Sequence, residues 1–319
     1  MIMEIWKEPL KVAMKPPLSY YGGKQRMSRH LIQLIPQHTT YVEPFCGGAA
    51  ILFAKPFPKV TNSHFYREFI NDLDGNLVNF FTQLRDNGEE LIGFLQMTPY
   101  SEKIHMGYKS KNFHKFNDLE RAAAYWYNIM TSFSKKIDGG WAKTTRTQNI
   151  MHTIINKIDN LQNYIDRMKT IGIFNRQAND IIKAMDTPHT FFYCDPPYPN
   201  SNQAYAKRGF KEKDFQELVD LLESCEGSFM LSCYENMKVK IPDTWQKFQF
   251  NSYCSAKGME KGMTRENTSR TETVYRRFHK GVLRKDIQKL FDSGCFDCFE
   301  RKTPTLEWEF INGKKQKRA

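Results

Sequence analysis

The sequence predicts an α/β protein with an open, doubly wound parallel sheet and an inserted, mainly helical segment. Short apolar runs that end in an acidic residue recur along the chain, and each is followed by a helical pattern of apolar positions. Between residues 89 and 168 this alternation stops, and helical patterns alone continue. We therefore expect the strand-ending acids to meet at one edge of the sheet, where open α/β sheets bind their ligands.

Composition indicates a globular protein with a polyanionic partner. The 319 residues are 40% hydrophobic and 26% charged, and the formal net charge of +12 favours a partner such as nucleic acid. No apolar run is long enough to span a membrane, and the first residues lack the apolar core of a signal peptide. We expect no membrane partner.

The seven cysteines are mostly single and lie in apolar surroundings, which favours reduced thiols and a cytoplasmic setting. Cys295 and Cys298 form the one close pair, and His279 is the one other metal-binding residue type near them. Because zinc needs about four ligands, we expect two buried cysteines there and no metal site.

The first motif is Tyr20 followed by Tyr21, a glycine pair and Lys24. A glycine pair at the start of a helix lets the backbone approach a ligand and turns N–H groups toward it. Apolar positions at helical spacing over residues 27–35 predict that helix, which ends before Pro36. Lys24 would lie in the first turn, where the helix dipole does not favour a cation. This placement indicates a function, although a turn with a surface lysine is the alternative.

Residues 41–50 are predicted to form a strand, a glycine-containing loop and the start of a helix. Gly47 and Gly48 permit close backbone contact with a ligand, and Glu43 adds a negative charge at the end of the strand. The loop does not match the Gly-x-Gly-x-x-Gly fingerprint, which makes a nicotinamide dinucleotide less favoured.

Residues 69–72 form the next predicted strand, and it runs into acidic residues before a helix begins. An acid at the end of the second strand of a doubly wound sheet binds ribose hydroxyls, and we assign this role to Asp72. Asp74 is predicted to cap the helix, and the alternative is that both acids are caps.

The inserted segment carries an apolar helix stripe and a basic loop. The stripe is predicted to be core and not a surface for stacking bases, and it consists of Tyr125, Trp126, Ile129, Met130 and Phe133. The loop over residues 134–146 has glycines at its turn and cations on both sides, which suits contact with nucleic-acid phosphates. Its cations are Lys135, Lys136, Lys143 and Arg146. A solvated loop without a ligand is the alternative.

After a helical pattern over residues 154–168, strand and helix alternate again over residues 171–175 and 178–185. The apolar run Thr190 to Cys194 then leads into Asp195, Pro196, Pro197 and Tyr198. The prolines lack an N–H and fix φ, so the backbone carbonyls around them are turned outward in a stiff turn. An ordinary strand that ends in a proline turn is the alternative.

This turn offers what an amino group on a planar heterocycle needs in order to act as a nucleophile. Asp195 and the Pro196 carbonyl are acceptors for the amine hydrogens, and Tyr198 offers a flat face for the ring. These hydrogen bonds would draw the amine lone pair out of conjugation and toward an electrophile.

The remaining chain continues the α/β pattern. We expect a polar lid over residues 199–209, a helix over 215–222, a buried strand over 228–234 and a hairpin of residues 245–253 and 272–278. The hairpin loop is basic and contains Lys257, Lys261, Arg265 and Arg270. Residues 281–319 have no assigned role, and we expect a solvated stretch over 314–318.

The run Asp195-Pro196-Pro197-Tyr198 resembles the catalytic motif of DNA adenine-N6 methyltransferases, and Tyr193-Cys194 before it resembles the Dam-type branch. Residues 20–24 and 43–50 resemble the cofactor motifs of that family. The order of these motifs is that of the α-class arrangement, and the resemblance extends over residues 17–278.

The resemblance implies a Rossmann-like methyltransferase sheet, divided into residues 1–88 and 169–280, with a target recognition domain over 89–168 and an extension over 281–319. It implies S-adenosylmethionine as methyl donor and a flipped adenine in double-stranded DNA as acceptor. The predicted catalytic residues are Asp195, Pro196, Pro197 and Tyr198. The predicted cofactor-binding residues are Tyr20, Lys24, Glu43, Gly47, Asp72 and Asp195.

A restriction endonuclease is a possible partner on this interpretation, and no pattern indicates the oligomeric state. The basic loop departs from the usual asparagine–arginine and glycine pattern of the recognition domain, which leaves the target sequence open. Three alternatives remain: an N4-cytosine DNA methyltransferase, an RNA adenine methyltransferase, and a catalytically silent nucleic-acid-binding protein.

Overall fold

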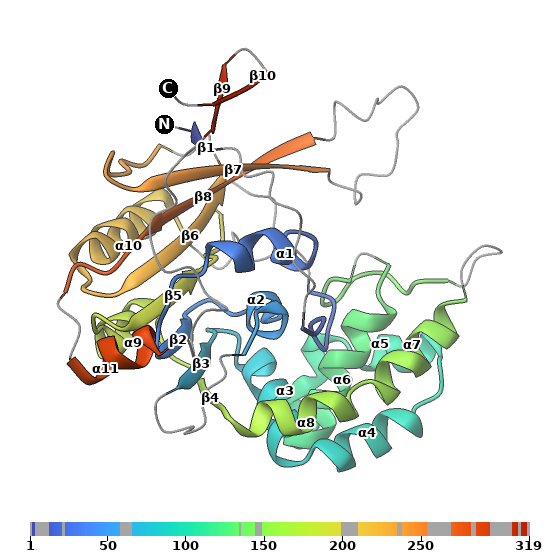
Figure 1. Ribbon diagram of the computed structural model, residues 1–319. Coiled ribbons are helices and arrows are strands. Elements are labelled where there is room, and N and C mark those ends of the chain that lie inside the picture. The colour runs from blue at the N-terminus through green and yellow to red at the C-terminus, as the bar shows by residue number, and fades with distance from the viewer. Residues whose placement is uncertain are drawn as a thin grey trace.

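The computed structural model describes residues 2–3, 13–20, 23–57, 66–133, 135–143, 149–198, 210–234, 238–253, 269–281, 285–293, 308–311 and 314–317. Its centre is an eight-stranded sheet in the order β1-β7-β8-β6-β5-β2-β3-β4 (Figure 1). The strands are β1 (Ile2–Met3), β2 (Thr40–Glu43), β3 (Arg67–Asn71), β4 (Ile171–Phe174), β5 (Thr190–Cys194), β6 (Ser228–Tyr234), β7 (Gln246–Tyr253) and β8 (Ser269–Arg277).

The sheet is doubly wound. From β2 the chain adds β3 and β4 on one side, and it then returns to the other side of β2 to add β5 and β6, all in parallel. The strand order therefore reverses between β2 and β5. Strand β8 runs antiparallel to both β6 and β7, which confirms the predicted hairpin and fold class.

The central strands are buried on both faces, as expected for parallel strands between helices. All residues of β2 and β5 are buried. On one face Tyr41 and Phe191 join the larger apolar cluster, and on the other Val42 and Phe192 join a second cluster. Because side chains alternate along a strand, Asp195 continues the row of Phe191 and Tyr193.

Helices cover both faces of the sheet. The second cluster includes residues of α9 (Ala178–Met185) and α10 (Glu212–Ser224). The first includes residues of α2 (Ala50–Ala54) and of two short turns, α1 (Ser28–Leu31) and η2 (Ile32–Leu34), which follow the turn η1 (Lys24–Arg26). The single helix predicted for residues 27–35 is thus a chain of short helical turns.

In its described residues the inserted segment forms helices and one isolated bridge between Ser132 and Trp141, and it gathers beside the sheet (Figure 1). Its elements are α4 (Gly88–Gln96), α5 (Glu102–Gly107), η4 (Ser110–Lys115), α6 (Asp118–Thr131), α7 (Ile150–Asp159) and α8 (Gln162–Lys169). Helix α6 is central, because it packs against α4, α5, α7 and also α3 (Gly75–Asp86).

Two expectations for this segment need correction. Phe133 does not belong to the buried stripe: α6 ends at Thr131, and Phe133 is 84% exposed. The other predicted members of the stripe are buried. The helix expected over residues 154–168 is broken into α7 and α8 at Asn160 and Leu161, although its apolar positions are buried as expected.

Beyond β8 the structure describes α11 (Lys285–Asp292) and an antiparallel pair of β9 (Trp308–Ile311) and β10 (Lys314–Lys317). Most of the stretch expected to be a solvated terminus thus forms strand β10. The predicted lid, the Cys295 and Cys298 pair and most of the basic hairpin loop lie outside the described residues. No helix in the described ranges is both long and apolar enough to cross a membrane.

Candidate active site

The loops that follow β2, β3 and β5 meet at the point where the strand order reverses. Parallel strands bring their carboxyl ends to one edge, so the Gly47 loop, Asp72 and Asp195 share that edge. The Gly47 N–H donates to Asp72 Oδ2 at 3.0 Å, which joins two of the three loops directly.

Gly47 has a left-handed backbone with φ of +47°, which favours glycine. A Cβ at Gly47 would lie 3.2 Å from Cδ1 of Tyr20, and one at Gly48 would lie 2.9 Å from Tyr20 Cβ. The structure therefore packs Tyr20 against the glycine loop and brings together residues predicted from two separate motifs.

Asp72 is largely buried and receives backbone N–H groups on both carboxylate oxygens. Besides Gly47, the N–H of Asp74 donates to Asp72 Oδ1 at 2.9 Å. Asp74 in turn accepts the Asn76 N–H at the start of α3, so its predicted role as a cap is confirmed. The ribose-binding role of Asp72 stays a prediction.

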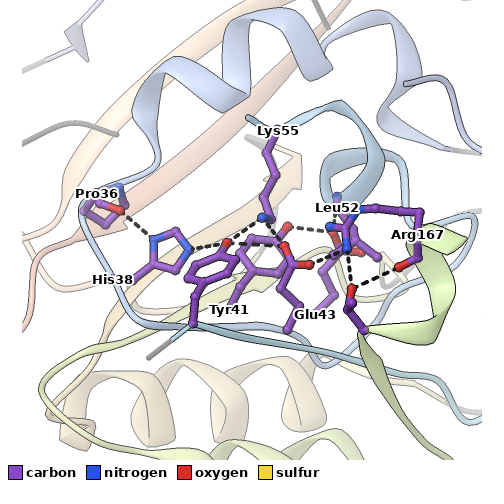
Figure 2. A network of polar contacts seen from close by, with 10 residues as sticks. Pro36, His38, Tyr41, Glu43, Leu52, Lys55 and Arg167 are labelled. Carbon is purple, nitrogen blue, oxygen red and sulfur yellow. Dashed lines mark hydrogen bonds and ion pairs between the residues drawn. The ribbon is translucent and has the colours of Figure 1, made fainter. Parts of the chain in front are cut away.

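Glu43 points into the protein, since it lies on the same face of β2 as Tyr41 (Figure 2). Its side chain is 1% exposed, and Oε1 accepts the Tyr41 hydroxyl at 2.6 Å and the Leu52 N–H of α2 at 2.7 Å. Burial raises the pKa of Glu43 to about 8. The carboxyl thus fixes the helix that follows the glycine loop, and its cofactor role stays a prediction.

A buried ionic network continues from this point to the inserted segment (Figure 2). Lys55, at the end of α2, pairs with Glu68 of β3, and Arg167 of α8 binds the second oxygen of the same carboxylate. Burial by itself raises the pKa of Glu68, but the two cations outweigh it and hold that pKa below its usual value. No sequence motif predicted this network.

The catalytic motif meets the first motif through Lys24. The Lys24 Nζ donates to Asp195 Oδ1 at 2.7 Å, to Asp195 Oδ2 at 2.9 Å and to the Tyr198 hydroxyl at 2.7 Å. Lys24 is 5% exposed and lies in the first helical turn, as predicted. The structure thus brings Lys24, Asp195 and Tyr198 into one cluster.

Sequence reasoning missed Glu272, which completes this cluster from β8. Its Oε1 lies 2.7 Å from Lys24 Nζ and accepts the Tyr198 hydroxyl at 2.7 Å. The same hydroxyl is 2.9 Å from Asp195 Oδ1. No motif marks Glu272, because it begins the predicted strand over residues 272–278 and its pairing with Lys24 and Tyr198 forms only in the folded sheet.

The cluster holds one lysine and two carboxylates, which gives a formal charge of +1 − 2 = −1. Burial by itself lowers the pKa of Lys24, but Asp195 and Glu272 outweigh it and raise that pKa above its usual value. Burial raises the pKa of Asp195 and the Glu272 charge adds to this, while Lys24 opposes both. Burial also raises the pKa of Tyr198, which keeps the phenol neutral.

Comparison with known families indicates which reaction the residues at this edge of the sheet catalyse. The family model of D12 class N6 adenine-specific DNA methyltransferases matches residues 20–253. The chain belongs to this family. The predicted family, fold class and enzyme class are thereby confirmed. Residue Glu272 lies beyond the matched region.

Several methyltransferases are similar in sequence. A Type II methyltransferase, M1.LlaDCHI from Lactococcus lactis subsp. cremoris, is 25% identical over 258 residues, which cover 74% of this chain and 86% of that protein. A DNA N-6-adenine-methyltransferase of Escherichia phage P1 is 23% identical over 63% of this chain, but the match covers 27% of the phage protein.

A third relative is the Type II methyltransferase M.CviBI of Paramecium bursaria Chlorella virus NC1A, which is 22% identical over 68% of this chain and 82% of its own length. Among solved structures, a putative methyltransferase, yhhF from Escherichia coli, covers 85% of this chain and is itself covered to 99%, at 13% identity and a TM-score of 0.36. That structural likeness is too distant to carry an argument.

In this D12-class chain, the ring predicted to stack on the target base is not open. Tyr198 is 5% exposed, and the Lys24 Nζ lies 5.0 Å from the centre of its ring. Pro196 is buried and Pro197 half-buried. The stacking role of Tyr198 stays a prediction.

The cations predicted to bind DNA differ in their surroundings. Lys143 is exposed, Lys136 is half-buried, and Arg146 lies outside the described residues. The half-buried Lys135 donates to the Met130 carbonyl in the last turn of α6. Burial and the charge of Lys157 on α7 lower the pKa of Lys135 to about 8.

Lys157 extends this basic group toward the first motif, because its Nζ donates to Ser19 Oγ at 2.9 Å. Separately, no cluster of three or more histidine, cysteine or acidic side chains suited to a metal occurs within the described ranges.

Proposed function

We propose that this D12-class protein transfers a methyl group from S-adenosylmethionine to N6 of an adenine that is flipped out of double-stranded DNA. The observation that carries the proposal is the position of Asp195, which follows β5 at the switch point beside the glycine loop, in contact with Lys24 and Tyr198. Family membership supports adenine N6 as the acceptor and makes N4 of cytosine a weaker alternative.

The chemistry of this edge fits a donor of this type. Gly47 and Gly48 let the Tyr20 side chain pack directly on the loop, and Asp72 and Asp195 add acids beside it. We propose that Tyr20, Lys24, Glu43, Gly47, Asp72 and Asp195 form the cofactor site, with Glu43 acting through α2. When bound, S-adenosylmethionine supplies an electrophilic methyl group and a neutral thioether leaving group.

The protein's own part in the reaction is to hold and orient the amine. Asp195 and the Pro196 carbonyl accept hydrogen bonds from the two N6 hydrogens, so that the lone pair points at the methyl carbon. With the donor held at this edge, the N–C bond would form as the methyl–sulfur bond breaks, with no covalent enzyme intermediate. The methylated nitrogen then gives up one proton, for which the Asp195 carboxylate is the adjacent acceptor. Much of the rate gain comes from this positioning.

We further propose that Lys135, Lys136, Lys143 and Arg146 contact the DNA backbone, which the charge of Lys157 close to Lys135 supports. A restriction endonuclease partner and a cytoplasmic setting fit this function, because several of the similar proteins carry Type II methyltransferase names.

The test is incubation of the purified chain with methyl-labelled S-adenosylmethionine and unmethylated duplex DNA, followed by nucleoside chromatography. Label in N6-methyladenine is the expected result. Label in N4-methylcytosine, or transfer to RNA but not to DNA, would establish one of the other acceptors. Failure to bind S-adenosylmethionine would favour the silent nucleic-acid-binding protein.

Substitution of Asp195 tests whether its carboxylate is needed for the transfer. Asp195→Ala is expected to lower kcat by about 10³-fold or more, because the amine loses its oriented acceptor, while the circular dichroism spectrum is unchanged. Asp180→Ala, on the exposed face of α9, is the matched control and should keep wild-type activity. Full activity of Asp195→Ala would refute the assignment.

A further inference from the structure

Two carboxylates share one lysine at this site, and the family comparison accounts for one of them. Glu272 lies on β8, outside the matched residues 20–253, and is 7% exposed. In the sheet it sits opposite Tyr234 of β6 and Phe250 of β7. Burying a second carboxylate beside Asp195 costs free energy that its pairing with Lys24 offsets only in part, and this cost points to a functional role.

The proposed role of Glu272 follows from the competition between two donors for the Asp195 carboxylate. Lys24 donates to both Asp195 oxygens, at 2.7 and 2.9 Å. These are the oxygens that the proposed reaction needs for the target amine, so the ammonium and the amine compete for one acceptor. Glu272 offers Lys24 a second carboxylate at 2.7 Å, and Lys24 therefore stays paired when an Asp195 oxygen turns to the base.

We propose that Glu272 is a positioning residue for methyl transfer, which holds Lys24 and the Tyr198 hydroxyl so that Asp195 is free to accept the target amine. This inference rests on the proposed function and deepens it. Glu272 itself does not touch the reacting atoms. It acts through Lys24 and Tyr198, each of which lies 2.7 Å from its Oε1.

The charge of Glu272 has a second effect. With it, the cluster carries one positive and two negative formal charges, and without it Lys24 and Asp195 form a neutral closed pair. Methyl transfer moves positive charge from the sulfonium to the amine nitrogen, toward this cluster. A fixed negative charge in a buried site stabilises charge that develops there.

The test compares the intact wild-type chain with Glu272→Gln, which keeps the shape and hydrogen-bonding capacity of the side chain and removes its charge. At saturating cofactor, we expect kcat for duplex DNA methylation to fall by about 10-fold or more. Glu272→Asp, which restores the charge on a shorter side chain, should recover part of the loss. Glu223→Gln, at the exposed Lys280 pair, is the matched control and should not change kcat.

A second readout needs no turnover. Calorimetry without DNA gives the Kd of S-adenosylmethionine, which carries the sulfonium charge, and of S-adenosylhomocysteine, which lacks it. We expect Glu272→Gln to weaken binding of the first by about 3-fold or more and to leave the second unchanged. A role in folding alone would change both affinities together.

The outcomes separate the two proposals. One outcome is that the wild type is active while Glu272→Gln changes neither kcat nor the ratio of the two Kd values, for S-adenosylmethionine and S-adenosylhomocysteine. That result would overturn the role of Glu272 and leave the proposed function standing. A wild type that binds the cofactor and methylates no nucleic acid would overturn the proposed function, and the role of Glu272 would fall with it. A loss of kcat in Glu272→Gln with partial recovery in Glu272→Asp would support both.

Discussion

Glu43 illustrates how the direction of one side chain decides its chemistry. It ends β2 at the ligand edge, yet its carboxyl is buried against Tyr41 and the Leu52 N–H. Burial raises its pKa from 4.5 to about 8. The carboxyl therefore stays protonated at neutral pH in the folded chain and is ionised in the unfolded chain.

The raised pKa of Glu43 predicts that the free energy of unfolding depends on pH. Below pH 4.5 both states hold the proton, but between pH 4.5 and 8 the unfolded chain releases it and the folded chain does not. The free energy of unfolding should therefore fall in this window, by up to about 1.4 kcal/mol for each pH unit from this group. Glu43→Gln does not titrate, so its stability relative to the wild type should rise from pH 5.5 to pH 8. Urea denaturation at both pH values measures this difference, and equal differences would contradict the prediction.

The residues of the site could be predicted from the sequence where they belong to a short local motif. Lys24 and Asp195 each belong to such a motif, although nothing in the sequence showed that their side chains meet across 171 positions. The inward direction of Glu43 follows from the alternation that places it with Tyr41, and this signal was available. Glu272 stands alone in β8, and its role depends on contacts that form only in the folded sheet.

At the scale of elements, α8 connects the inserted helices to the sheet through a buried charge. The Arg167 side chain is 18% exposed and its Nη1 lies 2.5 Å from Glu68 Oε2, while Lys55 neutralises the other oxygen. The alternation of strands and helices predicted most of these elements. The break between α7 and α8 escaped prediction, because the apolar spacing continues across Asn160 and Leu161.

Arg167→Met is expected to lower the free energy of unfolding by about 2 kcal/mol, since Glu68 keeps Lys55 but loses one of two buried cationic partners. Lys169→Met is the matched control, because Lys169 pairs with Asp166 at the surface of the same helix. Its effect should stay within about 0.5 kcal/mol. Equal effects of the two substitutions in urea denaturation would show that the Arg167 pair contributes no more than a surface pair.

For the whole molecule, the net charge of +12 predicts a salt-dependent affinity for DNA, and Lys135 adds a dependence on pH. Because its pKa is lowered to about 8 by burial and Lys157, Lys135 loses its charge as the pH rises from 7 to 9. The wild type should therefore bind duplex DNA more weakly at pH 9, whereas Lys135→Arg should keep its affinity.

Fluorescence anisotropy with a labelled duplex at fixed ionic strength measures this effect. Lys143→Arg is the control, because Lys143 is exposed, and it should follow the wild type at both pH values. The same loss of affinity in the wild type and in Lys135→Arg would assign the pH dependence to another group.

The position of β8 has a consequence for synthesis of the chain. Among the strands of the eight-stranded sheet, β8 comes last along the chain, yet it lies between β6 and β7 in the sheet. A nascent chain that has not yet released residues 269–277 from the ribosome has two unpaired strand edges and no Glu272 beside Lys24. The lysine and the two carboxylates thus come from the beginning, the middle and the end of the sheet-forming sequence. The catalytic cluster is therefore one of the last features to assemble, and translation of the sheet must be nearly complete before it exists.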